Sequence, residues 1–280
     1  MNNPDPSQAG GGHYPLQQLE WLVTALTHEP DTWALFLDID GTLIDLAPTP
    51  DAIVVPPPLP ANLNAISRHL GGALALVTGR ALPYADELFR PYQFPIAGLH
   101  GSERRSPAGH VARIAATAAF EEMKAALTAA AGEWPAVLIE DKGVAIAAHY
   151  RQAPEWREQL EEAMEYYLLQ AGSDFTLQRG KMVYEIRPSR ANKGSALQAY
   201  LEEEPFRGRR PITIGDDVTD EDMFRVANAL NGHSIRIAET RDDTEALGII
   251  PSAALLRDAL ARLAGSGRSP EQPARKGKSA

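Results

Sequence analysis

The chain has 280 residues, of which 44% are hydrophobic and 23% are charged, a composition typical of a globular protein with a sizeable buried core. Its formal net charge is −10, with 37 acidic and 27 basic residues, which disfavours binding to the backbone of a nucleic acid. The sequence contains no cysteine, so disulfides and thiolate nucleophiles are excluded.

Targeting and membrane signals are absent from the printed sequence. The first residues are polar and glycine-rich, without the basic and apolar regions of a signal peptide. The apolar runs are short and interrupted, so none is predicted to cross a bilayer. We therefore expect a cytoplasmic protein with no membrane or nucleic-acid partner. We also expect a monomer, although the sequence leaves an oligomer open.

In chain order, residues 1–15 are predicted to be a disordered lead, and helical spacing of apolar residues predicts a short helix from Leu16 to Leu26. Three compact apolar runs follow at Trp33–Leu37, Ala73–Val77 and Pro211–Ile214. Each run ends in polar or glycine residues before a helical pattern, as buried parallel strands do. The pattern predicts an α/β core with a doubly wound parallel sheet, whose polar strand ends meet at one crevice.

The segment between the second and third runs has a different pattern. Alanine-rich helical residues precede two strand-like runs, and a second helix precedes two more. This β-β-helix-β-β order predicts an antiparallel sheet with helices on one face. We place this α+β cap domain at residues 106–187, inserted into a core of residues 16–105 and 188–264. Residues 265–280 are predicted to be a disordered tail.

The strongest local signal is the segment Leu37–Leu43, in which Asp38 and Asp40 follow an apolar run and Gly41 permits a sharp turn. Two carboxylates held close together repel each other, so a hard divalent cation such as Mg²⁺ would neutralise them. A turn with a helix cap is the alternative for these residue types. The preceding strand and the following Gly-Thr-Leu favour a functional site.

Three further segments place polar groups where strands end or helices begin. Thr78 follows the second run, Lys193 opens a helix, and Asp216 and Asp220 follow the third run. The threonine and the lysine are suited to binding a phosphate, whereas packed carboxylates are costly without a cation. Taken singly, these residues also fit a capped turn, a solvated lysine or an acidic first helical turn.

Together and in this order, the four segments resemble the four motifs of the haloacid dehalogenase superfamily. The resemblance implies a phosphatase in which Asp38 attacks phosphorus and forms an aspartyl-phosphate. Asp40 would protonate the leaving sugar oxygen and then take a proton from water. Thr78 and Lys193 would bind the transferring phosphoryl group.

The same resemblance implies a Mg²⁺ site at this place. The ligands would be Asp38, the main-chain carbonyl of Asp40 and Asp216, and Asp220 would orient them.

Three stretches in and beside the predicted cap resemble trehalose-6-phosphate phosphatases: Gly98–Glu103, Glu140–Arg151 and Gly180–Pro188. The resemblance implies hydrolysis of trehalose 6-phosphate, the last step of trehalose biosynthesis. It implies that five residues contact the sugar phosphate: His100, Glu103, Lys142, Lys181 and Glu185. A solvated lysine in a turn and a surface carboxylate are the alternatives here.

Three other functions remain open. Another sugar phosphatase of the same superfamily, acting on sucrose or mannosyl phosphates, would keep the core residues and differ in the cap. A phosphohexomutase would return the phosphoryl group, which the cap stretches disfavour. A sugar-phosphate sensor would not need the intact carboxylates of Asp38, Asp40 and Asp216.

Overall fold

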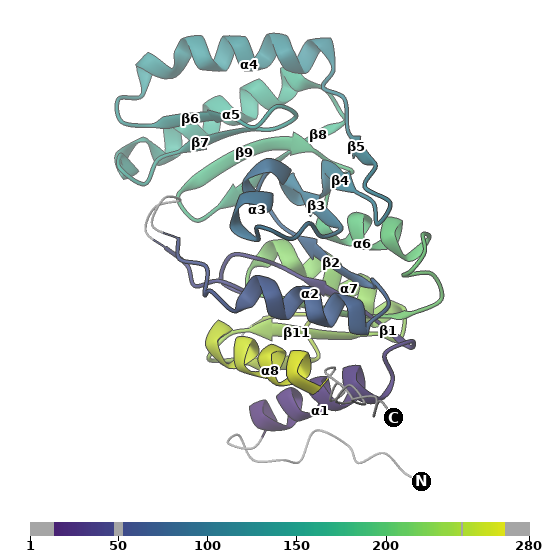
Figure 1. The fold of residues 1–280 in the computed structure, drawn as a ribbon. Helices are drawn as coiled ribbons and strands as arrows, with labels where there is room; N and C mark the ends of the chain where they lie inside the picture. The colour runs from purple at the N-terminus through teal and green to yellow at the C-terminus, as the bar shows by residue number, and fades with distance from the viewer. Residues whose placement is uncertain (1–13, 48–52, 242, 267–280) are drawn as a thin grey trace, which may run out of the picture.

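The computed structural model describes residues 14–47, 53–241 and 243–266. Figure 1 shows a core built on one large sheet, with a smaller unit of helices and strands at the top of the view. Most of the predicted lead and tail, residues 1–13 and 267–280, lies outside the described residues. Residues 14 and 15 already belong to a helix, and residues 265 and 266 end another.

Within the described ranges, the larger sheet has eight strands in the order β12-β11-β10-β1-β2-β3-β4-β5. Neighbours from β12 to β3 pair in parallel, whereas β4 and β5 add an antiparallel edge. The strand bounds are β1 Trp33–Leu37, β2 Leu74–Val77, β3 Ile96–Gly98, β4 Glu103–Arg105, β5 Val111–Arg113, β10 Arg210–Gly215, β11 His233–Ile237 and β12 Gly248–Ile250.

Helices cover this sheet on both sides, as predicted for a doubly wound fold. Helices α1, α2 and α8 pack together on one side, and α6 and α7 pack together on the other (Figure 1). All residues of β1 and β2 are consequently buried, which explains their continuous apolar sequences. The helix bounds are α1 Tyr14–His28, α2 Leu59–His69, α3 Leu82–Leu88, α6 Lys193–Leu201, α7 Glu221–Ala229 and α8 Ala253–Ser266.

The smaller sheet is antiparallel, with the order β6-β7-β9-β8, and it has its own hydrophobic core. Phe120 of α4 stacks on Phe175 of β8 in this core, with ring centroids 4.3 Å apart. Figure 1 shows the sheet between α4 and the larger unit. The bounds are α4 Ala118–Ala130, β6 Leu138–Asp141, β7 Ile146–His149, α5 Arg157–Ala171, β8 Phe175–Gly180 and β9 Val183–Pro188.

Strand pairing bears on where the insert begins. β5 falls within the predicted cap of residues 106–187, yet it pairs with β4 in the larger sheet. The chain therefore passes to the smaller sheet at residues 114–117 and returns at residues 189–192. The division into cap and core at residues 106 and 187 stays a prediction. No helix in the described ranges combines the length and the apolar character needed to cross a membrane.

Candidate active site

The carboxyl ends of three neighbouring strands deliver the predicted polar residues to one place. β1 pairs in parallel with both β10 and β2, so Asp38 after β1 lies between the residues that follow the other two strands. Asp216 follows β10, and Thr78 follows β2. Lys193 is the first residue of α6, a helix that follows the strands of the smaller sheet in the sequence. The predicted convergence of distant strand ends is thus present.

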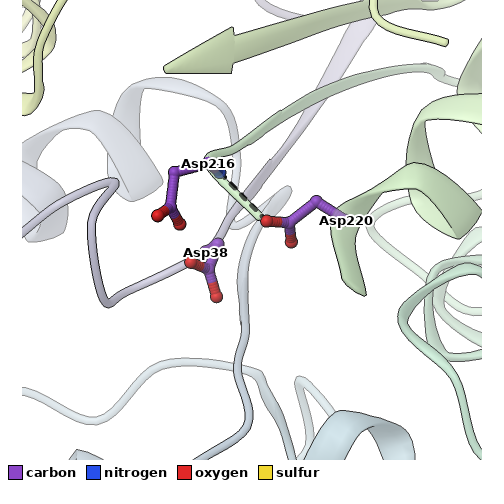
Figure 2. Close-up of side chains that lie close together, drawn as sticks. All are labelled: Asp38, Asp216 and Asp220. Atoms are coloured by element: carbon purple, nitrogen blue, oxygen red, sulfur yellow. Dashed lines mark hydrogen bonds between the residues drawn. The ribbon is translucent and has the colours of Figure 1, made fainter. Parts of the chain in front are cut away.

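Three carboxylates form an acidic cluster, which Figure 2 shows in close-up. Oxygen atoms of Asp38, Asp216 and Asp220 all lie within 4.8 Å of one another. Asp220 Oδ2 accepts hydrogen bonds from the backbone N–H groups of Asp216 and Asp217, each at 3.0 Å. A set of hard oxygen donors at this spacing suits a divalent cation.

Lys193 joins two members of this cluster. Its Nζ atom lies 2.6 Å from Asp38 Oδ1 and 2.6 Å from Asp220 Oδ1, and its side chain is almost fully buried. The lysine is fixed at the start of α6 because Asn192 and Ser195 form a reciprocal capping box around it. Its ammonium group therefore holds a defined place beside Asp38.

The shifted pKa values of Asp38, Asp216 and Lys193 reflect the burial and the close spacing of charges in the cluster. Burial raises the pKa of Asp38 well above its usual value, against the opposing charge of Lys193. Burial and the charge of Asp220 raise the pKa of Asp216 to about 7. Burial opposes the charge of Lys193, but Asp220 and Asp38 outweigh it and raise the pKa of the lysine. The site thus holds more negative charge than one lysine balances.

Gly41 makes room for the cluster in the turn after β1. Its φ of +76° lies in the left-handed region that favours glycine, and a Cβ atom there would come within 2.1 Å of Asp216 Oδ2. Thr42 follows, with Oγ1 at 3.3 Å from Asp38 Oδ2 and 3.4 Å from Asp216 Oδ1. The Gly-Thr pair after the aspartates thus shapes the site itself.

Asp40 pairs with an arginine that the sequence analysis did not assign. Arg80 Nε and Nη2 each lie 2.5 Å from a different carboxylate oxygen of Asp40, a bidentate ion pair. The guanidinium also lies over the ring of Tyr84, at 4.5 Å from its centroid. Thr78 Oγ1 accepts a hydrogen bond from the backbone N–H of Arg80 at 3.1 Å. The segment after β2 therefore controls the position of Asp40.

Lys142 and Glu185 come together on the smaller sheet. Lys142 Nζ lies 2.9 Å from Glu185 Oε2, and both side chains are largely buried. Lys181 lies exposed in the turn between β8 and β9, and the described contacts give it no ion pair. Glu140 Oε2 lies 2.9 Å from His149 Nε2 and 3.9 Å from Lys142 Nζ. The smaller sheet thus carries a linked set of polar groups.

His100 lies where the two sheets approach each other. Its backbone N–H donates to the carbonyl of Thr78 at 2.9 Å, and its ring occupies the space beside Gly79. Burial lowers its pKa well below the usual value, and the positive charges of Lys193, Arg187 and Lys142 lower it further. The imidazole is therefore neutral at physiological pH. Arg187, which the sequence analysis did not assign, acts on the site through this charge.

Glu103 has partners away from the acidic cluster. Its Oε1 accepts the backbone N–H of Leu82, the first residue of α3, at 2.6 Å, and its Oε2 lies 3.0 Å from Arg113 Nε. The side chain is 5% exposed. These contacts hold α3 and β5 to β4, and they leave neither oxygen free of a partner. Its predicted contact with the sugar finds no support in this arrangement.

Comparison with known proteins gives consistent results. A family model described as Trehalose-phosphatase matches residues 36–252. A probable trehalose-phosphate phosphatase of Sinorhizobium fredii is 61% identical over 245 residues, 88% of this chain and 92% of the relative. The trehalose-6-phosphate phosphatase of Escherichia coli is 40% identical over 221 residues, 77% of this chain and 82% of the relative.

Among solved structures, the C-terminal domain of trehalose-6-phosphate phosphatase from C. albicans superimposes with a TM-score of 0.74. Its sequence identity is 21%, and the match covers 87% of this chain and 96% of that domain. A haloacid dehalogenase-like hydrolase from Bacteroides thetaiotaomicron superimposes with a TM-score of 0.61 at 16% identity, covering 82% of this chain and 99% of that chain. At these identities the likeness concerns the fold.

The close approach of Asp216 to Gly41 predicts the effect of adding a methyl group at Gly41. Gly41→Ala should displace the Asp216 carboxylate and lower phosphatase activity on the order of a hundredfold, since small misplacements at a reacting centre have effects of this size. Gly208→Ala is the matched control, because Gly208 has a φ of +77° and no atom within 4 Å of the added Cβ. Backbone strain should cost each variant about 1 kcal/mol of stability, and the contact with Asp216 adds a further loss in Gly41→Ala alone. Equal activity of the two variants would contradict this account.

The raised pKa of Asp216 predicts how metal-free stability depends on pH. Because the folded state binds this proton more tightly than the unfolded state, the stabilisation is present at low pH and is lost as pH rises through about 7. In EDTA, Asp216→Asn should therefore melt at a higher temperature than the wild type, by a margin that grows from about pH 5 to about pH 8. Exposed Asp258 gives the control Asp258→Asn, which should show no such trend. A margin independent of pH would refute the predicted charge crowding.

Proposed function

The chain belongs to the trehalose-phosphatase family and is a phosphatase with a haloacid dehalogenase-like fold, and we propose that it hydrolyses trehalose 6-phosphate with the help of Mg²⁺. The products would be trehalose and phosphate, in the last step of trehalose biosynthesis. The observation that carries the proposal is the close cluster of Asp38, Asp216, Asp220 and Lys193 at the strand ends, of which only Asp216 is half-buried and the others are buried. A cytoplasmic location and a monomeric state stay predictions.

In the proposed reaction, a carboxylate oxygen of Asp38 attacks phosphorus while the bond from phosphorus to the sugar oxygen breaks. Asp40, protonated and with one oxygen released from Arg80, would give that proton to the departing oxygen. Water then attacks the aspartyl-phosphate, and Asp40 takes the proton that the water loses. Asp38 is suited to the first step because it lies at a strand end with Lys193 on one oxygen and Thr42 near the other.

Two further residues would hold the transferring group. The hydroxyl of Thr78 lies at the end of β2, and Lys193 Nζ lies beside the attacking carboxylate. Phosphoryl transfer spreads negative charge over the equatorial oxygens, so fixed donors and a buried cation stabilise it more than they stabilise the bound substrate. Lys193 would exchange part of its pairing with Asp38 for a phosphate oxygen.

The residues present fit a Mg²⁺ ion. Asp38 and Asp216 with the main-chain carbonyl of Asp40 would hold it, and their close, buried oxygens explain the raised pKa values of the two carboxyl groups. Asp220 would orient the ligands, because its two oxygens already contact Lys193 and the N–H groups after β10. When bound, the ion supplies charge neutralisation at the phosphoryl oxygens.

The smaller sheet would recognise the sugar. A disaccharide offers many hydroxyls, and a site with paired buried donors and acceptors rejects analogues that lack them. Lys142 and Glu185 provide such a pair, and the charge of Lys142 acts on the neutral ring of His100. Lys181 is exposed in the turn between β8 and β9. We propose these four residues as sugar contacts, and a contact from Glu103 stays a prediction.

The test is phosphate release from a panel of sugar phosphates: trehalose 6-phosphate, sucrose 6-phosphate, glucose 6-phosphate and mannose 6-phosphate. We expect release from trehalose 6-phosphate at a rate at least tenfold above the others, about 1.4 kcal/mol of discrimination. EDTA should abolish release, and Mg²⁺ should restore it. Asp38→Asn should be inactive, because an amide oxygen is a poor nucleophile. Preference for another sugar phosphate would reject trehalose 6-phosphate as the substrate. It would leave the roles proposed for the catalytic residues unchanged.

The Arg80–Asp40 ion pair predicts a dependence on the leaving group. Arg80→Gln should slow hydrolysis of trehalose 6-phosphate on the order of tenfold, because its alkoxide leaving group needs a well-placed proton donor. Hydrolysis of p-nitrophenyl phosphate should change little, since its leaving group departs without a proton. Arg90→Gln, which removes an exposed arginine paired with Glu87, is the matched control. An equal loss on both substrates would show that Arg80 supports phosphate binding or folding instead.

A further inference from the structure

Lys124 is a buried cation away from the acidic cluster, on helix α4 of the smaller unit. The residue is 6% exposed. Its Nζ atom lies 3.0 Å from each carboxylate oxygen of Asp141 and 2.8 Å from the carbonyl oxygen of Gly143. The described contacts add an ion pair with Glu121 on the same helix, at 3.1 Å. Lys124 therefore ties α4 to the turn between β6 and β7.

That turn carries Lys142 between the two residues that Lys124 contacts. Asp141 Oδ1 also accepts the backbone N–H of Gly143 at 2.7 Å, and Lys142 N–H donates to the carbonyl of Ala145 at 2.9 Å. Gly143 has a φ of +80°, a conformation that closes the turn. The backbone on both sides of Lys142 is thus held from α4.

Lys124 and the proposed sugar contacts lie on opposite faces of the smaller sheet. Ile139 of β6 packs into the core under the helices, and Asp141, two residues later, faces the same way. On β9, Tyr184 and Ile186 pack into that core, so Glu185 between them faces away from the helices. Lys124 therefore acts on Lys142 through the turn and does not contact a ligand that is bound on the other face.

The energetic character of this contact favours a positioning role over a stabilising one. Taking a lysine out of water costs free energy, and ion pairs with the exposed carboxylates of Asp141 and Glu121 return only part of it. An apolar side chain is often as stabilising at such a place. The ammonium group of Lys124 also lies over the ring of Phe120 on the same helix, with Nζ 5.6 Å from the ring centroid. The charged group is therefore best explained by what it holds in place.

We propose that Lys124 is a positioning residue for sugar recognition, which fixes the Asp141–Gly143 turn so that Lys142 and Glu185 stay paired on the ligand-facing side of the sheet. This inference rests on the proposed function, because it takes the Lys142–Glu185 pair as the part that contacts the sugar. Lys124 acts on substrate affinity and leaves the chemistry at Asp38 unchanged.

The test compares Lys124→Met with the wild type on trehalose 6-phosphate and on p-nitrophenyl phosphate, which has no sugar. Methionine keeps most of the side-chain length and removes the ammonium group. We expect the KM for trehalose 6-phosphate to rise about tenfold with kcat nearly constant, and both constants for p-nitrophenyl phosphate to stay unchanged. Glu121→Gln is the matched control, because Glu121 pairs with Lys124 but does not touch the turn. It should behave as the wild type.

Asp141→Asn provides a second route to the same answer should Lys124→Met fold poorly. The amide keeps an acceptor for Gly143 N–H and loses the ion pair with Lys124, so the same selective rise in KM is expected, with an unchanged far-ultraviolet circular dichroism spectrum.

The outcomes separate the two proposals. A wild-type enzyme without preference for trehalose 6-phosphate would reject the proposed function. A wild type that prefers it, with unchanged KM in Lys124→Met and Asp141→Asn, would reject the positioning role alone. Equal losses on both substrates would also reject it, because they would show that Lys124 only supports the fold.

Discussion

Repulsion among three closely spaced carboxylates, two of them buried and one half-buried, is the interaction on which the rest of the site depends. Asp38, Asp216 and Asp220 share one small volume, and Lys193 supplies one positive charge to them. In a medium of low dielectric constant this imbalance is costly, and it appears as the raised pKa values of Asp38 and Asp216. A divalent cation and a phosphoryl group would fit together there, because the cation would balance the carboxylates and leave Lys193 to bind the phosphate.

The topology brings this charge together from segments far apart in the sequence. β1 lies between β2 and β10, so three strand ends meet beside one another although the smaller unit separates them along the chain. Helix α6 begins directly after the chain returns from that unit, and its first residue is Lys193. The residue that pairs with Asp38 thus lies five residues beyond the last residue of β9, which couples the two units at the acidic cluster.

The strand ends, the paired aspartates and the β-β-α-β-β order could be predicted from the sequence, because each depends on the spacing of apolar and polar residues within a short segment. Asp38 and Asp216 follow apolar runs that can only be buried strands, and Gly41 marks a turn. Arg80 was missed because its partner Asp40 lies 40 residues earlier, and no spacing rule joins them. Glu103 was assigned to the sugar from its place in a motif, whereas packing directs its carboxylate to the start of α3. Pairing across packed elements depends on tertiary geometry.

The same geometry explains how a protein of net charge −10 can accept an anionic substrate. Burial lowers the pKa of His100, and the positive charges of Lys193 from the core and of Arg187 and Lys142 from the smaller unit lower it further. A neutral ring adds hydrogen-bonding capacity without adding charge, and its Nδ1 has no hydrogen-bond partner among the described residues. The cations thus gather where the two sheets meet, and the acidic surface elsewhere leaves this local potential intact. With a divalent cation bound at the acidic cluster, these cations would attract an anion to the place between Asp38 and the Lys142–Glu185 pair.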